Sequence, residues 1–269
     1  MYSTIQVLIP TFKKTKEDIV SLFSFWKLES DCIVSNQCGR VGEETLEYNG
    51  HTVKIIYSDT IGVSKNRNIL LNALSANLGV FIDDDCSLVD NYAQNILDEM
   101  NKYKADAALF TGYNDKGGII NTAPKTKVCT KYSHISHMGG PGICVSKVFI
   151  EKTNLSFNEK LGTPNRIYMG EDSFFGYELM KKKPVAINSN VLVFKVVNDI
   201  DNSSYFVGYN EQFFFSKGAI NKLVHPKSYK IWKLHYIRGL KKKTHQKTSF
   251  ILRNMKKGEK AIKKGRIIA

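Results

Sequence analysis

A strand-like run that ends in three aspartates constrains this chain more than any other feature. Residues 78–82 are uniformly apolar, as parallel strands buried on both faces are, and Asp83, Asp84 and Asp85 follow directly. Adjacent carboxylates repel one another unless a positive charge lies among them. Open α/β sheets bind ligands outside the carboxyl ends of their strands. The position therefore favours a divalent-cation site over the alternative, a solvated acidic turn.

Strand-like and helix-like segments alternate around this run. Thr15 and Asp18 are the ends of a capping box, which predicts a helix whose apolar stripe extends to Trp26. Further helices are expected over residues 62–76 and from about residue 90 to 103. The expected strands cover residues 5–9, 32–34, 53–57, 78–82 and 107–111. The alternation predicts βαβ units and hence an α/β fold with a Rossmann-like half.

The sequence after residue 112 is less regular. It is rich in turn residues and contains Gly139-Gly140-Pro141-Gly142 before a short strand at residues 143–145. A helix is expected from Glu171 or Asp172 to residue 183, followed by a long apolar strand at residues 185–197. Irregular segments of this kind commonly build substrate sites.

The cysteines argue against an extracellular framework. They are odd in number and contain no Cys-x-x-Cys pair, so neither disulfides nor a zinc site is expected. The N-terminal residues lack the basic and apolar regions of a secretion signal, and no 18 apolar residues run together. We therefore expect a cytoplasmic protein without a membrane-spanning helix. The cysteines are Cys32, Cys38, Cys86, Cys129 and Cys144.

Three motifs in order resemble the family 2 glycosyltransferases. They are Val-Leu-Ile-Pro-Thr-Phe at residues 7–12, Gly-Val-Ser-Lys-Asn-Arg-Asn at residues 62–68 and Phe-Ile-Asp-Asp-Asp at residues 81–85. The resemblance implies a GT-A fold with a mixed central sheet. In that arrangement residues 1–112 form the half that binds the nucleotide-sugar, residues 113–216 form the acceptor half of the same domain, and residues 217–269 are a basic, mainly helical extension.

The resemblance also implies roles for residues around the nucleotide of the donor, which is expected to be a UDP-sugar. Asp85 would bind Mn²⁺ or Mg²⁺, which suits hard carboxylate oxygens; in another register of the three aspartates, Asp83 would do so. Asn36 stands where the family has an aspartate that recognises uracil, and an amide can both donate and accept there. The expected nucleotide-binding residues are Pro10, Thr11, Asn36, Arg67, Asp83 and Asp84.

A second acidic pair begins the helix at residue 171. Acids at a helix start are common for electrostatic reasons alone. In the family, however, such a pair supplies the catalytic base, which implies that role for Asp172, with Glu171 in support. Gly139 and Gly140 resemble the loop that lines the donor sugar, although a plain turn explains them too. Some relatives complete the metal site with a histidine, for which the candidates are His134, His137 and His225.

Positive charge is concentrated in the last segment. Residues 217–269 hold 17 of the 39 Lys and Arg residues against the single acid Glu259. Basic residues interleaved with aromatic and aliphatic ones are typical of an interfacial helix that binds anionic lipid. Nucleic acid is the rival partner, but nothing in the expected fold resembles a nucleic-acid reader. We expect a peripheral position on the inner face of the cell membrane.

Together these features predict an inverting glycosyltransferase. It would move a sugar from a nucleotide diphosphate to a hydroxyl of a glycan or lipid-linked oligosaccharide in polysaccharide biosynthesis. A sugar nucleotidyltransferase is the alternative enzyme, although residues 12–15 match its phosphate loop poorly. A non-catalytic membrane or nucleic-acid adaptor is the alternative of another class. Periodicity does not fix the donor sugar, the acceptor, the linkage or the oligomeric state.

Overall fold

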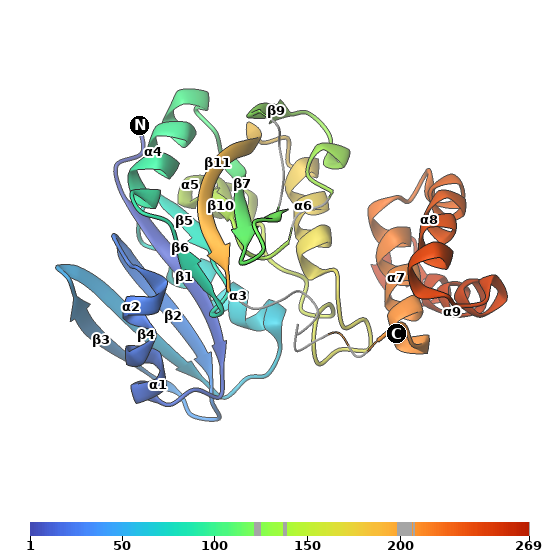
Figure 1. Cartoon of the computed structure of the whole chain (residues 1–269), viewed down its shortest axis with the longest axis horizontal. Helices are drawn as coiled ribbons and strands as arrows, with labels where there is room; N and C mark the ends of the chain where they lie inside the picture. The colour runs from blue at the N-terminus through green and yellow to red at the C-terminus, as the bar shows by residue number, and fades with distance from the viewer. Residues whose placement is uncertain (121–124, 137–138, 198–205, 207, 269) are drawn as a thin grey trace.

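The computed structural model describes residues 1–120, 125–136, 139–197, 206 and 208–268. Within these residues, eleven strands pair into one sheet, which helices cover on both faces (Figure 1). Three further helices form a separate lobe at the C-terminal end (Figure 1). The sheet order is β3-β4-β2-β1-β5-β10-β7-β11-β6, with β8 beside β7 and β9 beside β11.

The elements have the following bounds. The strands of the sheet are β1 (Ile5–Phe12), β2 (Asp31–Gln37), β3 (Gly42–Tyr48), β4 (His51–Ser58), β5 (Leu78–Phe81), β6 (Cys86–Leu88), β7 (Ala107–Asn114), β8 (Ile119–Ile120), β9 (Lys127–Cys129), β10 (Ile143–Ser146) and β11 (Ala186–Val196). The helices are α1 (Lys16–Ser21), α2 (Phe23–Trp26), α3 (Val63–Ala73), α4 (Tyr92–Tyr103), the 3₁₀ turn η1 (Tyr132–His134), α5 (Lys147–Thr153), α6 (Glu171–Lys181), α7 (Glu211–Val224), α8 (Tyr229–Thr244) and α9 (Thr248–Lys260). A small hairpin, β12 (Ile262–Lys263) and β13 (Arg266–Ile267), follows α9.

The expected α/β alternation is confirmed in the first half. β1 pairs in parallel with β2 and β5, and β2 pairs in parallel with β4. The predicted capping box at Thr15 is present. The helix expected through Trp26 is instead divided at Leu22, whose N–H bonds the carbonyl of Ile19 three residues back and so tightens the turn.

The sheet is mixed because β10 enters it in the opposite direction. β10 is antiparallel to both of its neighbours, β5 and β7, whereas β7 and β11 are parallel to each other. The antiparallel edge strand β3 was not predicted. Its sequence, Gly-Glu-Glu-Thr-Leu-Glu-Tyr, carries polar side chains on both faces, so it lacks the apolar alternation of a half-buried strand.

Two apolar layers hold the helices on the sheet. Val7 and Ile9 of β1 face the layer that contains α1, α2 and α4, whereas Leu8 faces the layer that contains α3, α5 and α6. Successive side chains of a strand point to opposite faces, so one apolar run supplies both layers. The helices that carry the site are thus fixed at the strand ends.

The C-terminal lobe packs on the α/β part through α6 and the β12–β13 hairpin. Phe174 of α6 shares an apolar cluster with Ile220 and Leu223 of α7 and with Ile262 and Ile267 of the hairpin. α7 begins at Glu211, so the shift in charge near residue 217 falls inside this helix. Across the part of the chain described above, no helix is both long and apolar enough to span a membrane.

Helices α7 and α9 approach so closely that only glycine fits at two points. A Cβ on Gly258 would lie 1.9 Å from the Phe215 carbonyl oxygen, and one on Gly218 would lie 2.2 Å from that of Met255. Gly239 of α8, by contrast, is exposed and has nothing within 4 Å of such a Cβ. Gly258 and Gly239 therefore form a matched pair of helical glycines, one tightly packed and one exposed.

Gly258→Ala should therefore lower the free energy of unfolding by about 1–3 kcal/mol, the usual cost of overpacking. Gly239→Ala should raise it by up to about 1 kcal/mol, because alanine is the better helix former. Urea titrations of both variants and the wild type would measure the difference. Equal stability of Gly258→Ala and the wild type would contradict the close packing of α7 on α9.

Candidate active site

The site lies where the parallel strands end. Thr11 of β1 is opposite Asn36 of β2, and Leu8 is opposite Phe81, the last residue of β5. The chain leaves β5 at Ile82 and reaches Asp83 at the same edge of the sheet. The acidic segment 83–85 and the loop after β1 are therefore neighbours, as their positions after parallel strands predict.

Arg67 connects these aspartates to the acidic pair at the head of α6. One guanidinium nitrogen, Nη2, lies 3.3 Å from Asp83 Oδ1. The other, Nη1, lies 3.2 Å from Glu171 Oε1 and also donates to Asp172 Oδ1. The Arg67 side chain is only 5% exposed, so one buried cation serves three carboxylates. The structure thus brings the two predicted acidic groups together through a third predicted residue.

The surroundings of Arg67 leave little freedom. The ring of Phe157 lies beneath the guanidinium, 5.5 Å from its carbon. A Cβ on Gly140 would lie 2.2 Å from Arg67 Nη2, so a side chain there would displace the guanidinium. Gly140 is therefore placed against the site, and its missing side chain makes room for the guanidinium. Gly139 precedes it in the same loop.

Asp172 is a carboxyl with an altered acidity. Its side chain is 17% exposed. Burial raises its pKa well above the usual range; the Arg67 charge lowers it in part, and the neighbouring Glu171 and Asp83 charges raise it again. Removal of a carboxylate from water disfavours the charged form, and here that effect outweighs the ion pair. A carboxyl with a raised pKa among other charged groups is suited to general acid–base work.

Lys14 is a residue of the site that sequence reasoning missed. Its Nζ lies 3.4 Å from Asp84 Oδ2, although burial still raises the pKa of Asp84. Asn36 holds this loop: its Nδ2 donates to the Lys14 carbonyl at 2.7 Å and its Oδ1 accepts from the Lys14 N–H at 3.3 Å. The signal for Lys14 in the sequence was its position: it follows β1, which pairs with β5, the strand that the three aspartates follow.

Two further buried amides fix the position of α3, and with it Arg67. Asn66 Nδ2 donates to the carbonyl of Thr11 at 2.9 Å, and Thr11 Oγ1 lies 3.5 Å from the carbonyl of Ser35. Gln37 accepts from the N–H of Gly62 and donates to its carbonyl at the start of α3. Thr11 and Asn36 are buried, whereas Pro10 is half-buried.

Asp85 has the chemistry of a partial metal site. Burial, followed by the charge of Asp83, raises the pKa of its carboxyl, and the thiol of Cys86 is 3.5 Å from Oδ1. No group of three or more His, Cys, Asp or Glu side chains that could hold a metal occurs among the described residues. One or two carboxylates with substrate phosphates and water are, however, the usual ligands of Mg²⁺. The donors present fit such a shared site.

The three histidines that were candidates for the metal site lie in separate parts of the chain. His134 is in η1, where its Nδ1 accepts from the N–H of Thr130 at 3.4 Å. His225 stacks on Trp232 with ring centroids 5.0 Å apart, and burial lowers its pKa. His137 lies outside the described residues.

These features define the class of the fold: an α/β fold of GT-A type, with a Rossmann-like half, a mixed central sheet and a basic helical extension. The structure is similar to that of S. aureus TarS 1–349 in complex with UDP-GlcNAc, with a TM-score of 0.60 and 15% sequence identity over 83% of this chain and 67% of that chain. The complex of TarS 1–349 with UDP gives a TM-score of 0.56 at the same identity.

The likeness covers only part of TarS. TarS 1–349 alone gives a TM-score of 0.57 at 15% identity, and this chain covers 66% of it. In the longer TarS structure, the chain covers 40%. No protein-family model matches the sequence, and no curated protein matches it.

The raised pKa of Asp172 predicts a gain in stability when its charge is removed. A carboxyl whose pKa is higher in the folded than in the unfolded state destabilises the fold above its unfolded pKa, about 3.9. Asp172→Asn should therefore raise the free energy of unfolding at pH 8 by about 1.4 kcal/mol or more, the equivalent of one pKa unit. The gain should shrink as the pH falls towards 4 and vanish below the unfolded pKa, where the carboxyl is protonated in both states.

Thermal and urea unfolding at both pH values would measure this effect. Asp90→Asn is the matched control, because Asp90 is exposed and its ion pair with Lys27 is on the surface, where such pairs contribute little. A loss of stability in Asp172→Asn at pH 8 would show that the ion pair with Arg67 outweighs desolvation.

Proposed function

We propose that this chain is a metal-dependent, inverting glycosyltransferase of family 2 that transfers a sugar from a UDP-sugar to a hydroxyl of a glycan. The observation that carries the proposal is the Arg67 bridge, which joins the acids after β5 to the acidic pair of α6. A donor site and a base are thereby adjacent. The fold shared with TarS, which has been solved with UDP-GlcNAc and with UDP, supports the choice of donor.

Asp85, with Asp83 as the alternative ligand, would hold Mn²⁺ or Mg²⁺ together with the donor diphosphate. When bound, such a cation offsets the negative charge on the departing nucleoside diphosphate. Lys14, beside Asp84, adds a fixed positive charge at the same edge. The nucleotide then lies along the ends of β1, β2 and β5.

Asp172 acts as the general base in this proposal. Attack by a hydroxyl requires removal of its proton. The carboxylate form of Asp172 can accept it, and its raised pKa makes that carboxylate a stronger base. Glu171 shares the Arg67 guanidinium and so helps to orient the pair. A donor phosphate that competes for Arg67 would weaken its hold on Asp172 and raise the basicity of that carboxylate further.

The remaining predicted residues take supporting roles. Pro10 and Thr11 line the end of β1 beside the nucleoside. Asn36 is engaged with the backbone of Lys14, so it would serve base recognition by shaping the loop after β1. Gly139 and Gly140 would line the donor sugar, with the space beside Gly140 itself filled by the Arg67 guanidinium.

The donor and metal assignments predict a specific stabilisation. UDP with Mn²⁺ should raise the melting temperature, because a ligand at 100 times its Kd stabilises the fold by about 2.7 kcal/mol. Asp85→Asn should abolish the metal-dependent part, whereas Asp98→Asn on the exposed side of α4 should leave it unchanged. A thermal-shift panel of UDP, GDP and ADP with and without Mn²⁺ measures this. No shift with any nucleotide would refute the proposed donor.

An exposed face of α8 supports peripheral membrane binding. Ile231 and Leu234 are 77% and 65% exposed, whereas Ile237 and Leu240 of the same helix pack inward. Exposed basic side chains lie around Ile231 and Leu234: Lys230, Arg238 and Lys241 in α8, and Lys227 just before the helix. An apolar centre flanked by cations matches an anionic lipid surface. We propose that α8 docks on the inner leaflet, where a lipid-linked acceptor would be presented.

The double variant Ile231→Ser/Leu234→Ser should then reduce co-sedimentation with phosphatidylglycerol vesicles by about tenfold or more, since both side chains lose their buried area in the lipid. Ile119→Ser/Val148→Ser removes exposed apolar side chains elsewhere and is the control. Undiminished sedimentation of the α8 variant, or preferential binding of RNA by the wild type, would contradict a lipid-binding role.

A further inference from the structure

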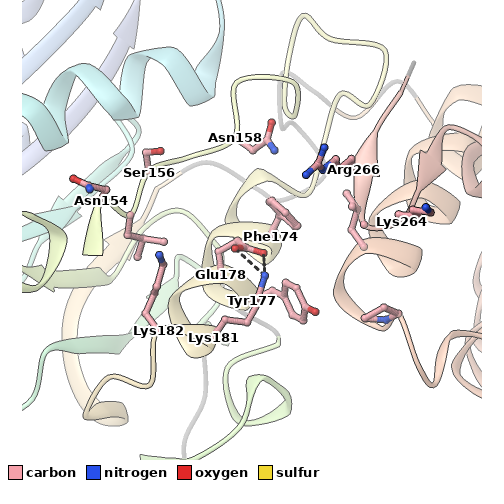
Figure 2. Close-up of a pocket in the computed structure, with 14 residues that line it drawn as sticks. Asn154, Ser156, Asn158, Phe174, Tyr177, Glu178, Lys181, Lys182, Lys264 and Arg266 are labelled. Carbon is pink, nitrogen blue, oxygen red and sulfur yellow. Dashed lines mark hydrogen bonds and ion pairs between the residues drawn. The ribbon is translucent and has the colours of Figure 1, made fainter. Parts of the chain in front are cut away.

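A cavity lies on the far side of α6 from Asp172. Its volume is about 520 Å³, within the range of small-molecule sites. α6 and the loop before it form one wall, and the end of α7 and the β12–β13 hairpin form the other (Figure 2). The α/β part and the C-terminal lobe therefore both contribute to it, and neither encloses it alone.

The cavity is separate from the carboxylate site although both share the same elements. In the loop at residues 156–158, Phe157 is buried beneath Arg67, whereas Ser156 and Asn158 line the cavity. In α6, Asp172 faces Arg67, whereas Phe174 and Tyr177 line the cavity. Residues two and five positions along a helix lie well away from the face of the first. A ligand in the cavity would thus leave Arg67 undisturbed.

Four cations line this space. Lys181 and Lys182 come from the end of α6 and its cap, and Lys264 and Arg266 come from the hairpin (Figure 2). Glu178 pairs with Lys181 at 2.9 Å and is the acid among the lining residues. In the described part of the chain, Lys182, Lys264 and Arg266 form no ion pair or hydrogen bond through their side chains. The cavity therefore carries a net charge of about +3.

The hairpin presents its two cations from a fixed turn. Lys264 and Gly265 both have positive φ angles, 49° and 73°, as in the two-residue turns that suit hairpins. Ile262 and Ile267 on either side are anchored in the apolar cluster with α7. The side chains of Lys264 and Arg266 thus project from a held backbone, which lowers the entropy lost when a ligand binds.

We propose that this cavity binds a phosphate-bearing carbohydrate. An arginine fork with lysine charges matches phosphate oxygens, and a net charge of about +3 suits a phosphate or diphosphate group. The amides of Asn154 and Asn158 and the hydroxyl of Ser156 can bond sugar hydroxyls. The rings of Phe174 and Tyr177 provide the apolar surface that such sites combine with polar groups.

Under the proposed function, on which this assignment of role rests, the ligand is an anionic part of the acceptor. The cavity would hold this anionic part of the acceptor at a distance from the acceptor hydroxyl that reacts. The phosphate could belong to a phosphodiester within a glycan or to the diphosphate of a lipid-linked sugar, and both present the same chemistry to the four cations.

Calorimetric titration of the full chain with glucose 1-phosphate and with glucose tests the binding itself. We expect the phosphate to bind and glucose to bind at least about tenfold more weakly. Saturating UDP and Mn²⁺ should leave the affinity unchanged. The methyl phosphodiester of glucose 1-phosphate and glucose 1-diphosphate then separate the two sources, since the preferred one binds more tightly.

Charge reversal in the cavity provides the second test. Lys264→Glu and Arg266→Glu should each weaken glucose 1-phosphate at least about tenfold, and melting temperatures should stay constant because both side chains are exposed. Lys256→Glu on the exposed side of α9 makes the same change of net charge outside the cavity and should alter affinity less than about twofold. The proposal would be overturned if all three variants weakened the binding of glucose 1-phosphate equally, or if glucose bound as tightly as glucose 1-phosphate. It would also be overturned if millimolar glucose 1-phosphate did not bind.

The UDP titration of the same variants separates this inference from the proposed function. Lys264→Glu should keep the full response to UDP and Mn²⁺, because the cavity and the carboxylate site lie on opposite sides of α6. Sugar phosphate binding without any UDP response would sustain the cavity and refute the donor. A UDP response without sugar phosphate binding would sustain the donor assignment and refute the proposed ligand of the cavity.

Discussion

The structure of the site depends on one buried cation. Asp83, Glu171 and Asp172 come from segments almost 90 residues apart, and each lies within bonding distance of the Arg67 guanidinium. At an effective dielectric of 20, two unit charges 4 Å apart interact by about 4 kcal/mol. Without Arg67, the three carboxylates would lose this compensation and repel one another, which would oppose the approach of the loop after β5 to the head of α6. Gly140 and Phe157 shape the space in which this cation sits.

The sequence predicted the parts of this arrangement better than their connection. Apolar runs and the acidic segment at 83–85 identified β1, β2, β4, β5 and the edge of the sheet where the site lies. The contact between Arg67 and Asp172 spans 105 residues. It depends on β10 entering antiparallel between β5 and β7, and hydrophobic periodicity carries no information on strand order.

Local patterns also concealed some residues that position the site. Lys14 follows β1 in a stretch of ordinary surface character, and its part in the site comes from the bond that Asn36 makes to its backbone. Asn36 was expected to recognise the base, and in the structure its amide bonds the backbone of Lys14 in the loop after β1. A polar side chain in a strand-end motif can hold the backbone as readily as it can bind a ligand, and the choice is set by packing that a linear motif does not contain.

The basic extension has more structure than its composition suggests. Its charge was visible in the sequence, but the division of that charge was not. α8 turns Ile231 and Leu234 outward among basic residues, whereas the hairpin directs Lys264 and Arg266 back toward α6. The close contact of α7 with α9 at Gly218 and Gly258 holds two helices of the same segment together. One basic segment thus provides two surfaces with different proposed ligands.

The most direct test of the central claim is the release of UDP from UDP-GlcNAc by the wild type and by Asp172→Asn, with Mn²⁺ present and water as the acceptor. The account predicts slow release by the wild type and a loss of about 100-fold or more in the variant, the contribution of a general base, while both bind UDP equally. Equal release by the two proteins would contradict the role of Asp172. No release by a wild type that binds UDP-GlcNAc would contradict glycosyl transfer from this donor.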